Sequence, residues 1–407
     1  MVGLYRRRRE LRVKAVHAVV VFLVFLSTCA AVASPDVQGT SAAGRLFTAG
    51  RFEEAAAAYR DILKATPTDT EATRRLGVIE LYRNHLDAAS GLLSTAQRLD
   101  PSNAAVRSAL AEVARRRAEA GKRVAVAGDE ATVPFVMRDP LPAVRVRING
   151  TRDATFLIDT GAPDIVLSAP FAKELGVKTT ASGMGTFAGG KHAPIETTTV
   201  QSIALGGATA YDVAAKIAPV PAIVPNVQID GIVGTGLMER FLATLDYPHG
   251  RLILRRRSTA SSETFQRTAR DTHATVVPFW LVGDHFVFAT ARVNDARPGL
   301  FLFDSGLAGG GLLPSTELIA TAHIKLDEAH AGMGMGGGGP IRAVPFAASS
   351  ITVGDVTQHD VPGIYSPDGS PFGIFPFTVQ GAISHEFLKH YAYTVDFDAM
   401  NIVLAPL

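Results

Sequence analysis

The stretch FLIDTGA at residues 156–162 returns later in the chain as FLFDSGL at residues 301–307, and this repetition decides the fold. Each copy is an apolar run long enough only for a buried strand, and each ends on an Asp, a small hydroxyl residue and a Gly. A single triplet of this kind is a weak signal, because it should occur by chance in roughly one chain in five. Its duplication after two matching apolar runs indicates two related halves.

Further landmarks follow each triplet in the same order and at nearly constant spacing. The matching segments are GIVG at 231–234 with GAIS at 381–384, TLDY at 244–247 with TVDF at 394–397, and LIL at 252–254 with IVL at 402–404. A glycine-rich segment also lies between the triplet and the GIVG-type segment in each half. Landmarks that recur in one order predict two homologous lobes.

These features resemble the aspartic proteases, and more closely their retropepsin-like bacterial branch, with two lobes fused in one chain as in pepsin. The resemblance covers about residues 132–407. It implies a two-lobed, mainly β-barrel fold in which an Asp-Thr/Ser-Gly loop from each lobe meets its partner at a pseudo-twofold axis. Because both loops are in one chain, no homodimer is needed to complete the site.

The chemistry of such a site explains the choice of residues. Hydrolysis of a peptide bond without a metal or a covalent intermediate requires water to lose a proton while the carbonyl oxygen gains one. Two carboxylates in contact can do both, because they cannot both ionise and therefore share one proton. The aspartic proteases are the standard example, and the resemblance assigns this pair to Asp159 and Asp304, with no cofactor and with the base and acid roles unassigned.

The neighbours of the two Asp have supporting roles. By resemblance, the hydroxyls of Thr160 and Ser305 cross-link the two loops and hold the pair rigid. Gly161 and Gly306 let the backbone turn tightly beside the carboxylates, where a side chain would clash. Three further glycines are expected to let the later segment of each lobe pass close under the loop: Gly231, Gly234 and Gly381. Ser384 stands where the family usually has Gly, so the backing of the second loop departs from the family pattern.

The glycine-rich segments 183–190 and 332–339 are interpreted as flaps, mobile hairpin tips that close over an extended substrate and exclude water. The candidate substrate-binding residues are Gly183, Gly185, Gly189, Gly334 and Gly336. The alternative is a disordered surface loop, above all for the second segment, since pepsin-type enzymes keep only one flap.

The chain is too long, at 407 residues, for one ordinary core, and its 47% apolar content is normal for a globular protein. We expect a multidomain α + all-β protein. Its parts are an export signal at 1–33, a helical repeat domain at 38–120, the first protease lobe at 132–255, a linker at 256–274 and the second lobe at 275–407. The linker is expected there because the segment combines four arginines with Ser, Thr and mixed charge.

Residues 1–33 carry a basic end, an apolar stretch and the small-residue sequence AVA before Ser34, which together are typical of an export signal. They predict a periplasmic or secreted protein. The alternative is a membrane anchor formed by residues 15–33, because the apolar stretch is nearly long enough to span. Without the signal the chain is mildly acidic, which implies no nucleic-acid surface. Cys29 is the single cysteine, so the mature chain has no disulfide and no thiolate metal site.

Residues 41–118 are rich in Ala, Leu and Arg, and their pattern repeats at 34 residues. The first copy places Gly50, Phe52, Ala55, Tyr59 and Pro67 where the second places Asn84, Leu86, Ala89, Leu93 and Pro101. This resembles the tetratricopeptide repeat and implies two helix pairs with a capping helix at 103–117. Such repeats either form a docking surface for a peptide or protein partner or act as a short spacer or stabilising cap, and both interpretations stay open.

One competing motif is excluded by its geometry. The segment HEFLKH at 385–390 contains two histidines, as a zinc-protease helix does, but His385 and His390 are five residues apart instead of four. On a helix this spacing rotates the second histidine about 140° from the first. We therefore expect no metal, and the predicted function is an exported aspartic endopeptidase acting on peptides or proteins. The alternative is a catalytically inactive, protease-like peptide-binding protein whose repeats dock a partner.

Overall fold

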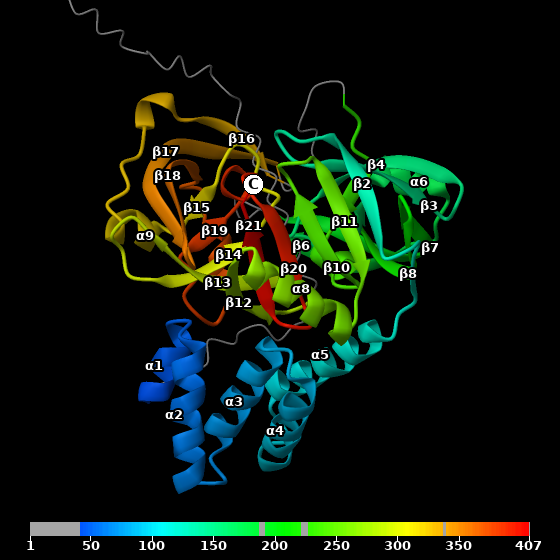
Figure 1. The fold of residues 1–407 in the computed structure, drawn as a ribbon. Coiled ribbons are helices and arrows are strands. Elements are labelled where there is room, and N and C mark those ends of the chain that lie inside the picture. Colours follow the sequence, from blue (N-terminus) through cyan, green and yellow to red (C-terminus); the bar gives the residue numbers. More distant parts are fainter. Residues whose placement is uncertain (1–40, 187–191, 221–226, 337–338, 407) are drawn as a thin grey trace, which may run out of the picture.

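The computed structural model describes residues 41–186, 192–220, 227–336 and 339–406. Helices at the start of the chain lie together below two β-rich lobes that stand side by side (Figure 1). The strands nearest the end of the chain run between the two lobes. The order of parts is therefore the predicted one, a helical repeat region followed by a two-lobed β fold.

The helical region has two helix pairs and a fifth helix. Its elements are α1 (Ala42–Thr48), α2 (Phe52–Ala65), α3 (Thr70–Tyr82), α4 (Leu86–Leu99) and α5 (Ala104–Ala120). The side chains of Asp69 and Asn103 cap α3 and α5, accepting hydrogen bonds from backbone N–H groups in the first turn at 2.8 and 3.2 Å. Ala55 and Ala89 are fully buried, because their small side chains let neighbouring helices approach. None of the described helices is long and apolar enough to cross a membrane.

The first lobe contains eleven strands among the described residues. They are β1 (Val124–Val126), β2 (Glu130–Met137), β3 (Ala143–Ile148), β4 (Arg152–Ile158), β5 (Ile165–Leu167), β6 (Thr180–Thr186), β7 (His192–Leu205), β8 (Ala208–Ile217), β9 (Gly231–Val233), β10 (Phe241–Asp246) and β11 (Arg251–Arg256). Two helices belong to it, α6 (Ala169–Leu175) and α7 (Thr235–Met238).

The second lobe repeats the plan. Its strands are β12 (Thr275–Val282), β13 (Phe286–Val293), β14 (Gly299–Phe303), β15 (Leu312–Pro314), β16 (Gly332–Gly336), β17 (Gly339–Val353), β18 (Val356–Tyr365), β19 (Gly381–Ile383), β20 (Ala392–Asp396) and β21 (Asn401–Ala405). Its helical segments are α9 (Thr316–Thr321), η2 (Glu328–His330), η3 (Pro371–Ile374) and α10 (His385–Leu388).

Equivalent strands in the two lobes pair in the same way. A hairpin joins β3 to β4, and its turn holds Asn149 and Gly150 at positive φ, as the Asn-Gly pair requires. Each strand that carries an Asp triplet then pairs in parallel with the later short strand, β4 with β9 and β14 with β19. The register places Phe156 opposite Gly231 and Phe301 opposite Gly381. The pairing thus puts each GIVG-type segment directly beside an Asp loop.

A sheet of six strands joins the lobes. Its order is β2, β11, β10, β20, β21 and β12, and all of its pairings are antiparallel. At its centre Thr244 lies opposite Thr394, and their hydroxyls form a buried hydrogen bond of 2.7 Å. One large apolar cluster contains buried residues of both lobes, including Leu245 on β10 and Val395 on β20 of this sheet. The lobes are therefore joined by backbone pairing as well as by packing.

The inter-lobe segment 256–274 is largely helical, since it contains α8 (Thr259–Asp271), which the sequence did not predict. Ser258 begins the helix with a capping box. Ser262 and Gln266 donate hydrogen bonds of 2.7 and 2.9 Å to the buried carboxylate of Asp396 on β20. The segment is thus fixed to the joining sheet.

Replacement of Thr394 by Val should lower the free energy of unfolding by about 1–2 kcal/mol, because it leaves the buried Thr244 hydroxyl without this partner. Urea unfolding measures the change. Thr290→Val, at an exposed position on β13, is the control and should shift stability by less than about 0.5 kcal/mol. Equal stability of the two variants would show that the hydroxyl pair does not help to join the lobes.

Candidate active site

Asp159 and Asp304 lie at the ends of β4 and β14, and each is 1% exposed. Their backbone N–H groups donate to the carbonyl oxygens of Val233 and Ile383, both at 3.0 Å, which extends the parallel pairing to the Asp itself. Each carboxylate accepts a 2.8 Å hydrogen bond at Oδ1 from the backbone N–H of the triplet glycine. The two loops therefore present their carboxylates in the same local geometry.

The triplet glycines show that the two carboxylates face each other. A Cβ atom on Gly161 would fall within 3.0 Å of the Asp304 carboxylate, and one on Gly306 equally close to the Asp159 carboxylate. Each glycine thus lies against the Asp of the opposite lobe, where only glycine leaves room. The predicted meeting of Asp159 and Asp304 is present in the fold.

Both carboxyl groups hold their protons more tightly than usual. Burial raises the pKa of Asp159 well above its ordinary value, and the negative charge of Asp304 raises it further. Burial likewise raises the pKa of Asp304, although the hydrogen bonds that this carboxyl group makes lower it. Two facing carboxylates in a dry site cannot both ionise, so the pair retains one proton into the pH range where a free carboxyl has lost it.

Thr160 and Ser305 link the two loops reciprocally. The Thr160 hydroxyl donates to the Phe303 carbonyl at 3.0 Å and accepts from the Ser305 N–H at 2.8 Å. The Ser305 hydroxyl donates to the Ile158 carbonyl at 3.2 Å and accepts from the Thr160 N–H at 3.0 Å. These four hydrogen bonds cross between the lobes in both directions and fix the distance between the Asp loops.

Of the three expected backing glycines, Gly234 lies against the chain just after the first Asp triplet, whereas Gly231 and Gly381 lie against β5 and β15. A Cβ atom on Gly231 would approach the Val166 carbonyl too closely, and one on Gly381 would lie 2.6 Å from the Leu313 carbonyl oxygen. Gly234 leaves no room for a side chain against the Pro163 carbonyl, which belongs to the chain just after the first triplet. The second lobe has Ser384 at the place equivalent to Gly234.

Ser384 supports the second loop through its hydroxyl. The Oγ atom donates to the Asp304 carbonyl oxygen and accepts from the Leu307 N–H at 3.0 Å. In the first lobe Thr235, the next residue after Gly234, donates to the Thr160 carbonyl at 2.7 Å. Both loops are thus backed by a hydroxyl, from positions that differ by one residue. Sequence reasoning missed Thr235, although a hydroxyl residue after GIVG was a visible signal.

Two buried tyrosines near the loops were also missed. Tyr247 and Tyr393 are 4% and 0% exposed, and burial is the main cause that raises the pKa of each phenol. The charges of Asp159 and Asp304 raise the pKa of Tyr247 further, and the charge of Asp304 acts in the same direction on Tyr393. Tyr247 is the last residue of the segment TLDY, and Tyr393 directly precedes the segment TVDF. Both carry neutral hydroxyls close to the acidic pair.

The glycine-rich segments form hairpins, not irregular loops, as far as they are described. Gly183 and Gly185 lie in β6, which pairs with β7, and Gly334 and Gly336 lie in β16, which pairs with β17. Gly189 lies outside the described residues. Met184, between Gly183 and Gly185, is 50% exposed, and Met335, between Gly334 and Gly336, is 39% exposed. Their role as flaps stays a prediction.

One cluster of potential metal ligands contains Asp139, His385 and Glu386, whose ligand atoms lie within 4.8 Å of one another. The ammonium group of Lys389 lies 2.8 Å from Glu386 and 3.4 Å from Asp139, so the cluster already contains a cation. His385 Nε2 lies 3.0 Å from Asp139 Oδ1, and burial lowers the pKa of this imidazole. The cluster therefore links the first lobe to α10 as an ion-pair network.

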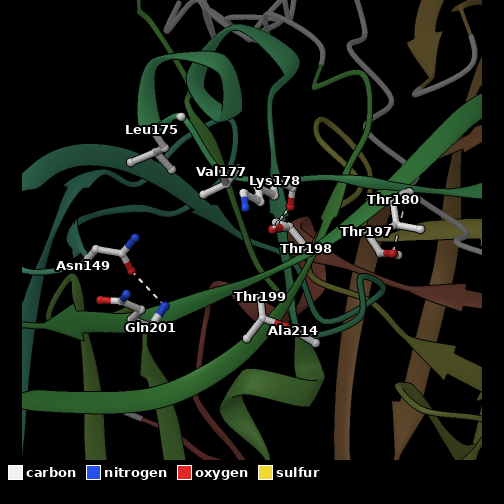
Figure 2. A pocket seen from close by; sticks show the side chains of 11 residues that line it. Asn149, Leu175, Val177, Lys178, Thr180, Thr197, Thr198, Thr199, Gln201 and Ala214 are labelled. Atoms are coloured by element: carbon white, nitrogen blue, oxygen red, sulfur yellow. Dashed lines mark hydrogen bonds between the residues drawn. The ribbon is translucent and has the colours of Figure 1, made fainter.

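A surface pocket of about 720 Å³ lies on the first lobe, next to α6 and β7 (Figure 2). Its polar lining includes Asn149, Lys178, Gln201 and a row of threonines. Neither Asp159 nor Asp304 lines it, and none of the predicted site residues does. This pocket is separate from the paired carboxylates.

Replacement of Ser384 by Ala should lower the free energy of unfolding by about 1–3 kcal/mol, because the buried Leu307 N–H loses its acceptor. Thermal or urea unfolding measures this loss. Ser349→Ala, at an exposed position on β17, is the matched control and should change stability by less than about 0.5 kcal/mol. A neutral Ser384→Ala variant would mean that the hydroxyl does not support the Asp304 loop.

Comparison with known proteins agrees with this geometry. The aspartyl protease family matches residues 144–237 and 289–375, and the tetratricopeptide repeat family matches residues 46–113. No match was found among curated proteins.

Two solved structures are among those similar to this chain. A retropepsin-like aspartic protease from Rickettsia conorii is 21% identical over 33% of this chain and 94% of its own, with a TM-score of 0.23. An aspartic proteinase from Irpex lacteus is 13% identical over 68% of this chain and 97% of its own, with a TM-score of 0.42. The match to the aspartyl protease family thus includes one segment from each lobe, and the match to the tetratricopeptide repeat family lies in the helical region before them.

Proposed function

We propose that this protein is an exported aspartic endopeptidase that hydrolyses peptide bonds with a water molecule activated between Asp159 and Asp304. The observation that carries the proposal is the reciprocal arrangement of the two loops. Each carboxylate faces the other, each lies against the glycine of the opposite triplet, and the loop hydroxyls link the lobes in both directions. The export signal at residues 1–33 supports the location, periplasmic or secreted.

The shared proton gives the pair both functions that hydrolysis needs. The ionised carboxylate takes a proton from water as the water oxygen attacks the peptide carbonyl carbon, and the protonated carboxyl gives its proton to the carbonyl oxygen. The tetrahedral intermediate then collapses. One of its two hydroxyl groups returns its proton to the ionised carboxylate as the C–N bond breaks, and the proton taken from water passes to the leaving amine. The pair ends with one proton, as it began, so no cofactor is required by the cycle.

The alternative is a peptide-binding protein without catalytic activity. Such a protein would gain nothing from a buried pair of carboxyl groups. Burial raises the pKa of both carboxyls, and the charge of Asp304 raises that of Asp159 further. Such a pair lowers the stability of an unliganded fold at neutral pH. We therefore favour the enzyme, in which the same pair of carboxyl groups provides the acid and the base.

Asp159→Asn and Asp304→Asn should each reduce peptide cleavage at least about 100-fold, because either change removes the shared proton and one of its two sites. The assay follows cleavage of a diverse peptide mixture by residues 34–407 from acid to neutral pH. Asp153→Asn is the matched control, since Asp153 also lies on β4 but is exposed and pairs with Arg147. If all four proteins fold and none cleaves any peptide at any pH, peptide binding becomes the better explanation.

Asp159→Asn should also become more stable relative to the parent protein as pH rises. In the parent protein the raised pKa of the pair means that the folded state binds more protons than the unfolded state above about pH 4. Stability is therefore lost as pH rises from the unfolded pKa through the folded pKa. Unfolding free energies at pH 3 to 7 test this, and a constant difference across that range would contradict the raised pKa.

A further inference from the structure

The helical repeats pack against the second lobe through one continuous apolar cluster. The helices contribute Phe47, Phe52 and Tyr82, and the second lobe contributes Trp280, Phe288 and Phe377, among others. The ring centroids of Phe52 and Trp280 are 5.5 Å apart, across the boundary between the two parts. The lobe-facing surface of the repeats is therefore occupied by this chain itself.

Phe377 is the centre of that contact. It is 4% exposed, and its ring centroid lies 5.0 Å from that of Phe52 and 6.1 Å from that of Tyr82. On its other side the rings of Phe288 and Phe375 lie at 5.5 and 5.6 Å. The side chain is thus held between helices α2 and α3 and the sheet of the second lobe.

The chain leads from Phe377 directly to the Asp304 loop. The Thr378 N–H donates to the Thr48 carbonyl at the end of α1, at 2.7 Å. Strand β19 follows at once and pairs with β14, whose last residue precedes Asp304. Ser384, directly after β19, then donates to the Asp304 carbonyl. The segment 377–384 therefore has one end fixed to the helices and the other fixed under the Asp loop.

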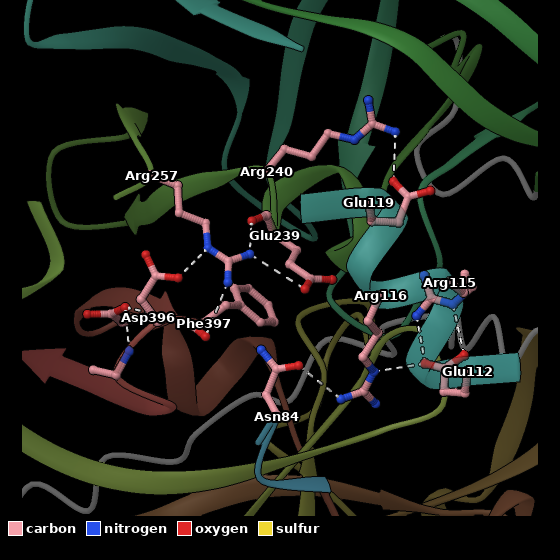
Figure 3. A network of polar contacts seen from close by, with 12 residues as sticks. Asn84, Glu112, Arg115, Arg116, Glu119, Glu239, Arg240, Arg257, Asp396 and Phe397 are labelled. Atoms are coloured by element: carbon pink, nitrogen blue, oxygen red, sulfur yellow. Dashed lines mark hydrogen bonds and ion pairs between the residues drawn. The ribbon is translucent and has the colours of Figure 1, made fainter. Parts of the chain in front are cut away.

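Helix α5 adds polar contacts to both lobes, and Figure 3 shows one of them, between Glu119 and Arg240. The buried guanidinium of Arg116 donates to the Leu281 carbonyl at 2.9 Å and to the Gly283 carbonyl at 2.8 Å, at the turn between β12 and β13. Glu119, one turn further, pairs with Arg240 of the first lobe at 3.2 Å. The helical region is therefore bonded to each lobe near their junction.

We propose that the helical repeats are an internal brace that binds segment 377–384 of the same chain and thereby positions the Asp304 loop. In this role Phe377 and Arg116 are positioning residues, and the lobe-facing surface of the repeats is not a docking site for another protein. The catalytic consequence rests on the proposed function, whereas the structural role does not.

The test compares Phe377→Ala with Phe171→Ala in the full chain. Phe171 is 3% exposed and lies on α6 of the first lobe, so the two variants lose equally buried rings. For Phe377→Ala we expect at least tenfold faster hydrogen exchange in segment 378–384, red-shifted emission of Trp280, which is the single tryptophan, and a kcat at least tenfold lower with KM within threefold. For Phe171→Ala, the exchange rate and kcat should stay within twofold of the parent protein, and the Trp280 emission should not shift.

A second pair of variants covers the case in which Phe377→Ala does not fold. Arg116→Met removes the hydrogen bonds to Leu281 and Gly283, whereas Arg115→Met removes a neighbouring arginine that shares the partner Glu112. The first should shift Trp280 emission and lower kcat, and the second should do neither.

The readouts separate the two proposals. If the parent protein cleaves nothing, the proposed function fails, and exchange and fluorescence still decide the brace. Unchanged exchange and emission in folded Phe377→Ala or Arg116→Met would overturn the brace. Altered exchange with a normal kcat would overturn its role in positioning the Asp304 loop.

Discussion

The fold depends on holding two buried carboxylates against each other. Burial opposes the ionisation of both carboxyls, and the charge of Asp304 opposes that of Asp159 further, so the site needs contacts that hold the two loops in place. The hydroxyls of Thr160 and Ser305 supply that restraint, because each bonds to the backbone of the opposite lobe as donor and as acceptor. A hydroxyl is suited to this position since it offers both roles within one small group.

The restraint at the loops requires that the lobes behind them do not shift. The six-stranded joining sheet provides this by continuing backbone hydrogen bonds from one lobe to the other at β10 and β20. Helix α8 fastens the connecting segment to the same sheet through Asp396. The sheet therefore fixes the two lobes relative to each other, and a change in the sheet should alter the positions of the Asp loops.

The sequence predicted the features that depend on repeated local pattern, and it missed those that depend on contact between distant residues. The two Asp loops, the segments beside them and the helix pairs all leave a repeated signature, so their arrangement could be anticipated. The helical form of 256–274 could not, because its polar face bonds to Asp396, more than a hundred residues away. Tyr247 and Tyr393 were missed for a similar reason, since only the fold brings them near the acidic pair.

The two lobes differ in what holds the segment before the short strand, β9 in the first lobe and β19 in the second. Asp230 and Gln380 are equivalent, and the backbone N–H of each donates to the strand before an Asp loop, to Thr155 and Leu300. In the first lobe the Asp230 side chain also accepts a hydrogen bond from the Thr155 N–H at 2.9 Å. The segment before β9 is therefore held to β4 by a carboxylate of the same lobe. The second lobe has Gln380 at this position, and its segment before β19 is held by the apolar contact of Phe377 with the helices. The repeats thus replace, from outside the lobe, a restraint that the first lobe contains within itself.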